Sequence, residues 1–253
     1  MDPEQAQRRD DPFGRQMLDY LEDCHTWEII ERDDGHVSLG SGPARFFAPY
    51  DEWCQAEREA IKLAHGRVVD IGCGAGRHSL YLQAQGIDVM GIDASPGAVE
   101  VCEIRGLREV RQLSLEGLDD RFGRFDTALL LGLSSGYLGT PKGVVASLQR
   151  LHTLTTQSGV ILLGNGGADD VMDDESSRAY LRRNINAGRY AGYRRMRIRY
   201  RGHTTEWFDF LRLTLPEVEE LLSETGWEID RLFQERASYY VCALRKRGPN
   251  GNR

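Results

Sequence analysis

The sequence lacks the features that would assign it to a membrane, secreted or nucleic-acid-binding class. No apolar run approaches the ~20 residues that span a bilayer, and the N-terminal stretch MDPEQAQRRDDPFG has no apolar core of a signal peptide. The five cysteines are odd in number and form no close pairs, which favours a reduced protein. The formal net charge of -7 argues against general affinity for nucleic acid. We therefore expect a cytoplasmic globular protein without a membrane segment.

Two common nucleotide-binding patterns are also missing. There is no G-x-x-x-x-G-K-[ST] loop, and the dinucleotide pattern G-x-G-x-x-G, counted from Gly72, meets Arg77 at its third glycine. The stretch VVDIGCGAGRH, residues 68–78, instead predicts a strand, a tight glycine turn and the start of a helix. Glycines suit a turn whose backbone angles are costly for residues with a Cβ, and they let a ligand lie against bare backbone. This turn is therefore a predicted ligand site.

Two acids indicate the class of ligand. Asp70 ends the strand before the glycines, where a carboxylate suits an ammonium group better than a pyrophosphate. A helix over 77–85 and a second apolar strand over 88–93 follow, and this strand ends in Asp93. In a doubly wound sheet the end of the second strand lies beside the first turn, where an acid can accept both ribose hydroxyls. The ligand is therefore expected to carry an ammonium group and an unphosphorylated ribose.

The segments VDIGCGAGRH and GIDAS resemble those of the class I S-adenosylmethionine-dependent methyltransferases, over roughly residues 51–163 and 214–244. The resemblance implies a Rossmann-like α/β fold, S-adenosylmethionine as cofactor and methyl transfer as the activity. It places the first acid and the glycine loop at the methionine part of the cofactor and the second acid at the ribose. Matching Leu118 to a leucine of the family puts Ser114 where the family often has an adenine-binding acid. The cofactor residues implied are Asp70, Gly72, Cys73, Gly74, Asp93, Ala94, Ser114, Leu115 and Leu131.

An alternative interpretation of the same residues stays open. A glycine turn can also occur because a strand and a helix pack closely, and an aspartate at a strand end can be a helix cap or a surface residue.

The rest of the chain alternates between strand and helix patterns, as a doubly wound, mostly parallel seven-stranded sheet requires. Further strands are expected at 110–115, 125–131, 160–164, 229–233 and 239–244, and helices at 12–23, 51–64, 96–105, 141–155 and 214–223. The resemblance implies that the last two strands form an antiparallel hairpin. We expect an N-terminal helix, hairpin and lid over 1–50, and a methyltransferase domain over 51–253 with an inserted cap over 165–213.

The cap is β-rich and rich in arginine. Arginines at 195, 197, 199 and 201 alternate with Met196, Ile198 and Tyr200, which predicts a strand with one apolar face. Residues 205–213 predict a second strand and residues 175–187 a helix. The arginines follow an acidic run at 169–175, so they form either a surface that selects the substrate or a solvated face paired with acids.

Candidates for contacts with the substrate are Tyr50, Tyr137, His203 and Trp207, and the cap also offers Glu206 and Asp209 as possible contacts. Tyr50 ends an aromatic, turn-rich segment that, with Trp53, is expected to close over the cofactor. Tyr137 lies in the loop after the fourth strand, at the carboxyl edge of the sheet. His203 has a side chain that titrates near neutrality, although lone loop histidines are often only exposed, so we assign no catalytic residue. Arg45 and Arg77 are candidates for the carboxylate of the cofactor.

Three functions fit the sequence: a small-molecule methyltransferase, an RNA or ribonucleoprotein methyltransferase using the arginines, and a non-catalytic S-adenosylmethionine-binding protein. The acidic charge and the compact insertion favour the first. The N-D-P-P-Y motif and the Pro-Cys pair of DNA-base enzymes are missing after the fourth strand, which disfavours DNA bases. No metal site is expected. The acceptor atom, any general base and the oligomeric state stay open.

Overall fold

The structure, a computed structural model, describes residues 11–132, 134–166, 175–234 and 239–248. The chain divides into two compact units. Unit 1 consists of Met1–Glu52, Asp70–Leu115 and Arg194–Phe208. Unit 2 consists of Trp53–Val69, Glu116–Tyr193 and Asp209–Arg253. Each unit is therefore built from segments that are far apart in the sequence.

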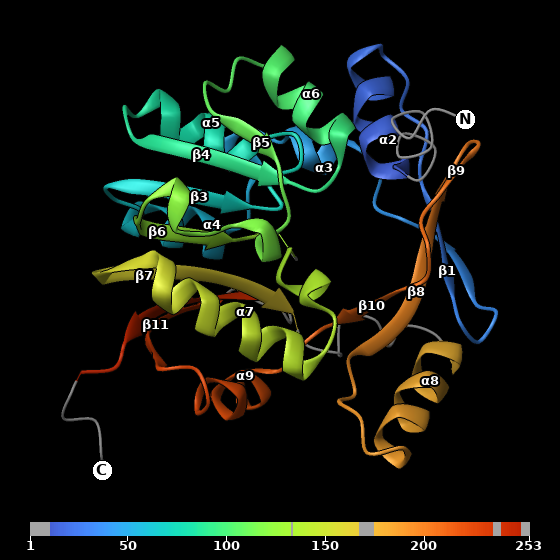
Figure 1. Cartoon of the computed structure of the whole chain (residues 1–253). Coiled ribbons are helices and arrows are strands. Elements are labelled where there is room, and N and C mark those ends of the chain that lie inside the picture. Colours follow the sequence, from blue (N-terminus) through green and yellow to red (C-terminus); the bar gives the residue numbers. More distant parts are fainter. Residues whose placement is uncertain (1–10, 133, 167–174, 235–238, 249–253) are drawn as a thin grey trace. The chain divides into compact units, whose positions relative to one another are not determined.

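Over the described residues, seven strands form one sheet in the order β11-β12-β7-β6-β3-β4-β5 (Figure 1). Their bounds are β3 Arg67–Ile71, β4 Asp88–Asp93, β5 Val110–Gln112, β6 Phe125–Leu130, β7 Thr155–Gly166, β11 Trp227–Gln234 and β12 Tyr239–Lys246. Strands β4 and β5 pair in parallel, as do β6 and β7, whereas β12 is antiparallel to both β7 and β11. The predicted Rossmann-like α/β sheet, with its antiparallel C-terminal hairpin, is confirmed.

Unit 1 contains the helices that follow strands β3 and β4 and the helices of the N-terminal segment. Helices α5 (Arg77–Ala84) and α6 (Pro96–Ile104) follow β3 and β4 in the chain. Helix α2 (Pro12–Leu21) packs against α6, and the short helix α3 (Ala44–Phe47) follows in the N-terminal segment. Phe46 and Phe47 of α3 pack on a buried cluster that includes Met17. The aromatic N-terminal segment is therefore part of a hydrophobic core.

A second sheet has the order β10-β8-β1-β2 over the described residues, with β9 paired to β8. Its strands are β1 Ile29–Arg32, β2 Val37–Leu39, β8 Tyr193–Tyr200, β9 His203–Thr204 and β10 Phe208–Leu211. The apolar face predicted for β8 is confirmed, because Met196, Ile198 and Tyr200 are buried. The N-terminal hairpin and the insertion thus share one sheet, which periodicity within either segment cannot specify.

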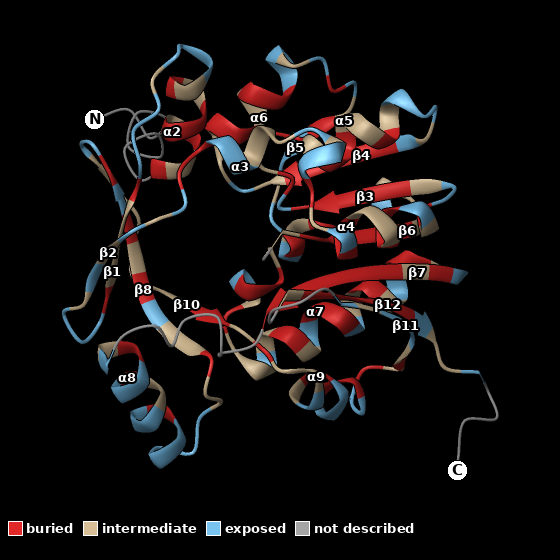
Figure 2. Ribbon diagram, turned by 180° about the vertical axis from the view of Figure 1, so that it is seen from behind, coloured by how far each residue is buried: buried red, intermediate tan, exposed pale blue. Residues whose placement is uncertain are grey.

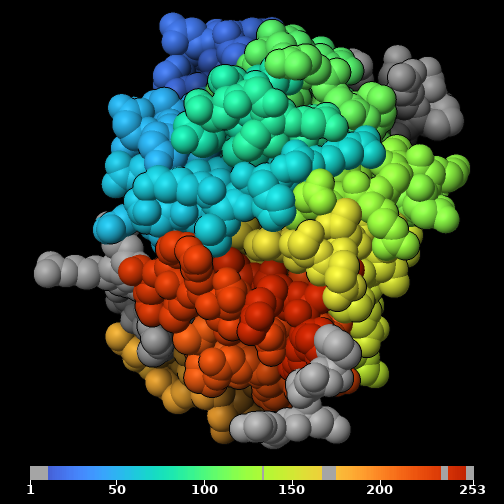
Figure 3. All heavy atoms as spheres, turned by 90° about the vertical axis from the view of Figure 1, so that its left-hand side faces the viewer, coloured from blue at the N-terminus to red at the C-terminus, as the bar shows by residue number. Residues whose placement is uncertain are grey.

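Unit 2 contains helices α4 (Gln55–Ala60), α7 (Pro141–Leu154), α8 (Glu175–Asn186) and α9 (Leu215–Leu222). A capping box of Thr214 and Glu217 starts α9, the helix predicted over 214–223. Trp227 is fully buried, and its indole Nε1 donates to the carbonyl of Leu148 in α7 at 2.8 Å. Figure 3 shows the C-terminal strands, in red, beside the residues near 150–160, in yellow. Helix α8 exposes much of its surface (Figure 2).

The helix expected over 51–64 is interrupted. The turn η1 (Tyr50–Glu52) precedes α4, and η2 (Ile61–Leu63) follows it. Trp53 is only 3% exposed, so it belongs to the core of unit 2. Cys54 has extended backbone angles and forms the N-cap of α4. The predicted continuous helix over 51–64 is therefore wrong, because α4 is a short helix between two turns.

Short turns connect β5 to β6 and β6 to α7. The third predicted strand ends at Gln112 rather than at 115, and three short turns follow: η3 Leu115–Gly117, η4 Asp120–Phe122 and η5 Ser134–Leu138. Within the described ranges, no helix has the length and apolar character needed to cross a membrane. The acidic residues 169–174 lie outside the described residues.

Candidate active site

The glycine turn joins β3 to α5 within unit 1. Gly72, Gly74 and Gly76 have φ angles of 69°, 57° and 76°, a region in which side chains with a Cβ are strained. The amides of Gly72 and Cys73 donate to the carbonyl of Ile92 in β4, at 2.9 and 3.1 Å. A Cβ on Gly74 would lie 3.5 Å from the ring of Phe46. The turn is therefore held against β4 and covered in part by α3.

Asp70 is buried at the end of β3, with 2% of its surface exposed. The hydroxyl of Ser79 in α5 donates to its Oδ2 at 2.6 Å. Burial raises the pKa of Asp70, and the neighbouring charges of His78 and Arg77 act in the opposite direction. An ionised carboxylate in such surroundings is stabilised by any further positive charge. A ligand ammonium group would supply that charge.

Asp93 is held in place by backbone amides. Its Oδ2 accepts from the amide of Gly74 and its Oδ1 accepts from the amide of Ser95, both at 2.9 Å. Burial raises the pKa of Asp93 from 3.8 to about 6, opposed by those two hydrogen bonds and increased by the charges of Asp11 and Asp70. A carboxylate has about four lone-pair sites, so two remain for ligand donors. The glycine turn and the second acid therefore form one hydrogen-bonded structure.

Asp11 extends this structure to the N-terminal helix, a role that the sequence did not reveal. Its Oδ1 accepts from the amide of Gly14 and so caps α2. Its Oδ2 accepts from the hydroxyl of Ser95 at 2.8 Å and from the amide of Gly97 at 3.0 Å. The only sequence signal was the helix start at Asp11–Pro12. Hydrogen bonds thus run from α2 through Ser95 to Asp93 and the turn.

Close packing of α2 on α6 leads to a first prediction. A Cβ on Gly97 would lie 2.6 Å from the Cα of Gly14, which is backbone and cannot move aside without shifting the helix. We expect Gly97→Ala to lower the free energy of unfolding by about 1–3 kcal/mol, the usual cost of overpacking. Urea unfolding followed by circular dichroism measures it. Gly202→Ala is the matched control, because no atom of the described residues lies within 4 Å of its added Cβ. Equal stability of the two variants would contradict the packing described.

Other residues predicted at the cofactor lie near these acids. Ala94 follows Asp93 directly and is exposed. The amide of Leu113 donates to the carbonyl of Asp93, which places the exposed Ser114 and the buried Leu115 just beyond the end of β4. Cys73 is buried, with its Sγ 3.9 Å from the Sγ of Cys102. The hydrogen bond with this second thiol, and then burial, raise the pKa of Cys73, which disfavours its thiolate form.

Two predicted residues belong to unit 2. Leu131 follows β6 and is 5% exposed, whereas Tyr137 in η5 is 50% exposed and meets the ring of Phe210 edge-on, with centroids 5.1 Å apart. The backbone just after Leu131 is bound by Tyr239, a residue that was not selected from the sequence. Its hydroxyl accepts from the amide of Gly132 at 3.1 Å and donates to Glu57 at 2.9 Å.

The remaining candidates lie in unit 1. The contacts that they make are with residues outside the glycine turn. Tyr50 stacks on Tyr81 of α5, with ring centroids 4.5 Å apart. His203 is half-buried in β9, and Trp207 lies under the guanidinium of Arg197. Arg45, a candidate for the cofactor carboxylate, pairs with the buried Glu28 at 3.0 Å.

Comparison with known proteins agrees with this geometry. Residues 68–159 match the model of a methyltransferase domain family. A Bacteroides fragilis S-adenosylmethionine-dependent methyltransferase, solved with S-adenosylhomocysteine, superposes with a TM-score of 0.79 at 24% identity, over 94% of this chain and 96% of that one.

Two curated relatives extend the comparison. A ubiquinone biosynthesis O-methyltransferase of Dechloromonas aromatica is 32% identical over 37% of this chain and 42% of its own length. A glycine/sarcosine N-methyltransferase of Halorhodospira halochloris is 24% identical over 72% of this chain and 73% of its own. The chain spans about half the length of other curated relatives it matches, 48% and 50% in two cases. The chain therefore has the fold of the class I S-adenosylmethionine-dependent methyltransferases, and residues 68–159 match a methyltransferase domain family.

Proposed function

We propose that the protein transfers the methyl group of S-adenosylmethionine to a small-molecule acceptor. The observation that carries the proposal is the carboxylate of Asp93, held by the amides of Gly74 and Ser95 at the end of β4. This fixed acceptor lies at the position where doubly wound folds bind a ribose. Its two remaining lone-pair sites fit the two hydroxyls of an unphosphorylated ribose. The site residues present therefore suit this cofactor.

Each cofactor residue has a separate proposed role. Asp70 pairs with the ammonium group of the methionine part, and Gly72, Cys73 and Gly74 present their backbone to it. Asp93 accepts the ribose hydroxyls. Residues around the adenine are Ala94, Ser114 and Leu115, and Leu131 lies at the end of β6 in unit 2.

Methyl transfer requires mainly that the protein align the acceptor with the methyl group. When bound, S-adenosylmethionine supplies a methyl group on a positively charged sulfur, and its transfer to an acceptor lone pair leaves S-adenosylhomocysteine. The chain's own residues then have to orient the two molecules and exclude water. A dedicated base is not required by such a displacement, and we assign none.

The arginines of the insertion support a small molecule over RNA. Glu175 pairs with Arg178 and Arg182, and Glu31 pairs with Arg197 and Arg199. Arginines that neutralise acids of their own protein contribute less to a field that attracts phosphates. The names of the two curated relatives, which act in ubiquinone biosynthesis and on glycine and sarcosine, also point to small acceptors.

Release of S-adenosylhomocysteine tests the proposal. The full chain is incubated with S-adenosylmethionine and either a panel of small phenols, amines, thiols and carboxylates, or total RNA. We expect acceptor-dependent product only with a small molecule. Product formed only with RNA would favour the second function, and binding of S-adenosylmethionine without any transfer would favour a non-catalytic role.

The raised pKa of Asp93 predicts a pH dependence. Because this pKa is about 6 in the folded chain, about one tenth of the groups are ionised at pH 5. If ribose hydroxyls bind the ionised form, affinity for S-adenosylhomocysteine falls about tenfold between pH 7.5 and pH 5. Calorimetry over this range measures it. Asp93→Asn serves as the control and is expected to remove most of the slope. An equally steep profile in that variant would assign the titration to another group.

Stability is expected to change in the opposite direction over part of this range. The pKa of Asp93 is raised above its ordinary 3.8, so between these two values the folded chain binds more protons than the unfolded chain. The contribution of Asp93 to stability is therefore fully present below about pH 4 and is lost as the pH rises through about 6.

A further inference from the structure

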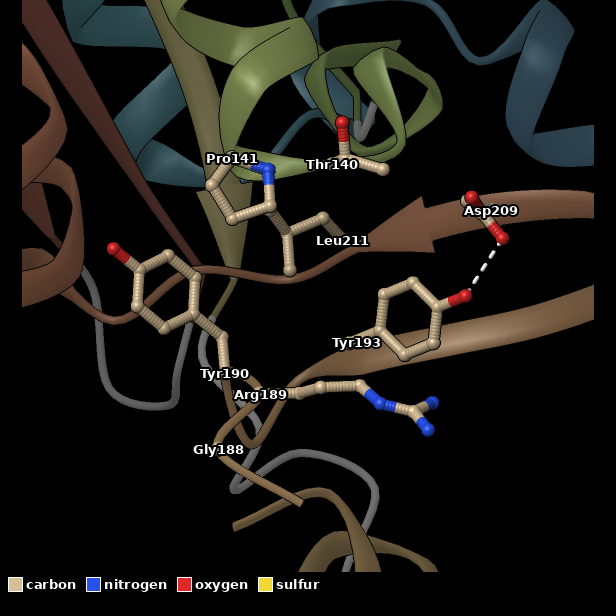
Figure 4. Close-up of a pocket in the computed structure, with 8 residues that line it drawn as sticks. All are labelled: Thr140, Pro141, Gly188, Arg189, Tyr190, Tyr193, Asp209 and Leu211. Atoms are coloured by element: carbon tan, nitrogen blue, oxygen red, sulfur yellow. Dashed lines mark hydrogen bonds between the residues drawn. The ribbon is translucent and has the colours of Figure 1, made fainter.

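A pocket of about 460 Å³ lies in unit 2, between the turn after α8, strand β10 and the start of α7. Its walls are the rings of Tyr190 and Tyr193, with Pro141 and the buried Leu211 between them (Figure 4). Arg189 and Asp209 supply charged groups on one side. A volume of this size suits a small organic molecule, and pockets of this kind combine apolar walls with a few polar groups.

Arg189 differs from most other arginines of the insertion. Five of those, at 178, 182, 197, 199 and 201, form ion pairs with acids of the chain. Arg189 has no carboxylate partner within the part of the chain that the structure describes, and its guanidinium lies 5.3 Å from the ring centroid of Tyr193. A guanidinium presents a planar fork of donors that matches a carboxylate. An anionic group of a ligand is therefore expected beside Arg189.

The hydroxyls of the two tyrosines point in opposite directions (Figure 4), each toward an acid of the chain. The hydroxyl of Tyr193 donates to Asp209 at 2.7 Å, and that of Tyr190 donates to Glu220 at 3.1 Å. Burial, and then these acids, raise the pKa of each tyrosine to about 12, so both hydroxyls stay protonated. With each proton committed to a carboxylate, the lone pairs of the phenolic oxygens are left for a ligand. A hydroxyl or amino group of a ligand suits them.

The pocket adjoins the loop that leaves β6. Thr140 caps α7, the helix that follows η5. A Cβ on Gly139 would lie 3.1 Å from the carbonyl oxygen of Asp209, so this loop packs directly on β10. Tyr137 of the same loop contacts Phe210. In doubly wound folds the loops after the carboxyl ends of the strands carry the ligands.

We propose that this pocket is a binding site for a small carboxylate with a hydroxyl or amino group on an apolar body. Arg189 binds the carboxylate, the hydroxyl of Tyr193 accepts from the donor group, and Pro141 and Leu211 contact the body. This ligand preference does not rest on the proposed methyltransferase function.

Four simple probes test the ligand class: 4-hydroxybenzoate, 4-aminobenzoate, benzoate and the neutral 4-hydroxybenzamide. Their binding to the full chain is measured by ligand-observed NMR and calorimetry. We expect the first two to bind most tightly, benzoate to bind less tightly because it lacks the donor, and the amide least. Equal affinity for the amide and the two substituted carboxylates, or no binding of any probe, would overturn the proposal.

Substitutions in the pocket test where the probes bind. Arg189→Gln is expected to weaken the two substituted carboxylates about tenfold or more, the usual effect of losing a hydrogen bond to a charged group. Arg182→Gln is the matched control, because Arg182 lies on α8 and pairs with Glu175. Tyr193→Phe should reduce the preference for 4-hydroxybenzoate over benzoate. Unchanged binding to Arg189→Gln would contradict the assignment.

The same variants distinguish a failure of the pocket proposal from a failure of the proposed methyltransferase function. Affinity for S-adenosylhomocysteine is measured on each variant and is expected to be unchanged. A wild-type chain that binds the carboxylates but not S-adenosylhomocysteine would retain the pocket and remove the methyltransferase function. A chain that binds S-adenosylhomocysteine but none of the probes would do the reverse.

Discussion

Replacing Asp93 by alanine is expected to weaken the binding of S-adenosylmethionine and of 5′-methylthioadenosine equally, each by about 100-fold. Both ligands carry the ribose, and losing two hydrogen bonds to a carboxylate costs about 3 kcal/mol in total. The variant also removes the acceptor of the Gly74 and Ser95 amides, so the glycine turn loses its link to the end of β4. Calorimetric titration with each ligand measures the effect.

Two controls separate lost contacts from lost folding. Glu103→Ala removes an exposed acid of α6 and is expected to leave both affinities unchanged. Asp93→Asn keeps one carbonyl acceptor and should bind with intermediate affinity. If Asp93→Ala folds and binds 5′-methylthioadenosine as tightly as the wild type, Asp93 does not contact the ribose.

Asp70→Asn is expected to discriminate between the same two ligands. S-Adenosylmethionine should bind about tenfold to 100-fold less tightly, because its ammonium group loses a charged partner in a buried site. 5′-Methylthioadenosine has no amino-acid part, so its affinity should not change. Asparagine retains an oxygen that can accept from Ser79, which keeps the local hydrogen bond that the structure shows at 2.6 Å. A similar loss for both ligands would mean that Asp70 only shapes the turn.

The same substitution is expected not to destabilise the chain at neutral pH. Burial raises the pKa of Asp70 in the folded chain, so its ionised form is disfavoured by folding. Asparagine has no charge to bury. Urea unfolding at pH 7.5 should therefore give a free energy of unfolding at least equal to that of the wild type, while cofactor affinity falls.

Local sequence patterns were sufficient for several elements of the two sheets. The run VVDIGCGAGRH predicted the strand, turn and helix that the structure has, and the alternation around Met196, Ile198 and Tyr200 predicted the buried face of β8. These features depend on backbone angles and on one-sided burial, which neighbouring residues encode. They could be predicted without knowledge of distant segments.

Partners that are far apart in the sequence could not be predicted in this way. The alternation of arginines in β8 gave no sign that Glu31 of β1 neutralises two of them. Asp11 was predicted only as a helix start, although its carboxylate also accepts from Ser95 and Gly97. Pairing of segments over long separations depends on the whole fold, and a single sequence holds no local signal for it.

The residues of the pocket also could not be selected from the sequence. Tyr137, His203 and Trp207 were selected because aromatic and titratable residues stood in predicted loops. Arg189, Tyr190 and Tyr193 were not selected, although the structure gathers them with Asp209 around one cavity. Arg189 was one of several arginines in the sequence, and the ion pairs of five others distinguish it from those five.

Calorimetric titration of the chain with S-adenosylhomocysteine, repeated on the double variant Asp70→Asn/Asp93→Ala, tests most directly the claim that two acids and a glycine turn bind the cofactor. We predict saturable binding at one site per wild-type chain and no measurable binding to a folded double variant. Absence of binding to the wild type, or equal affinity in the double variant, would contradict the account.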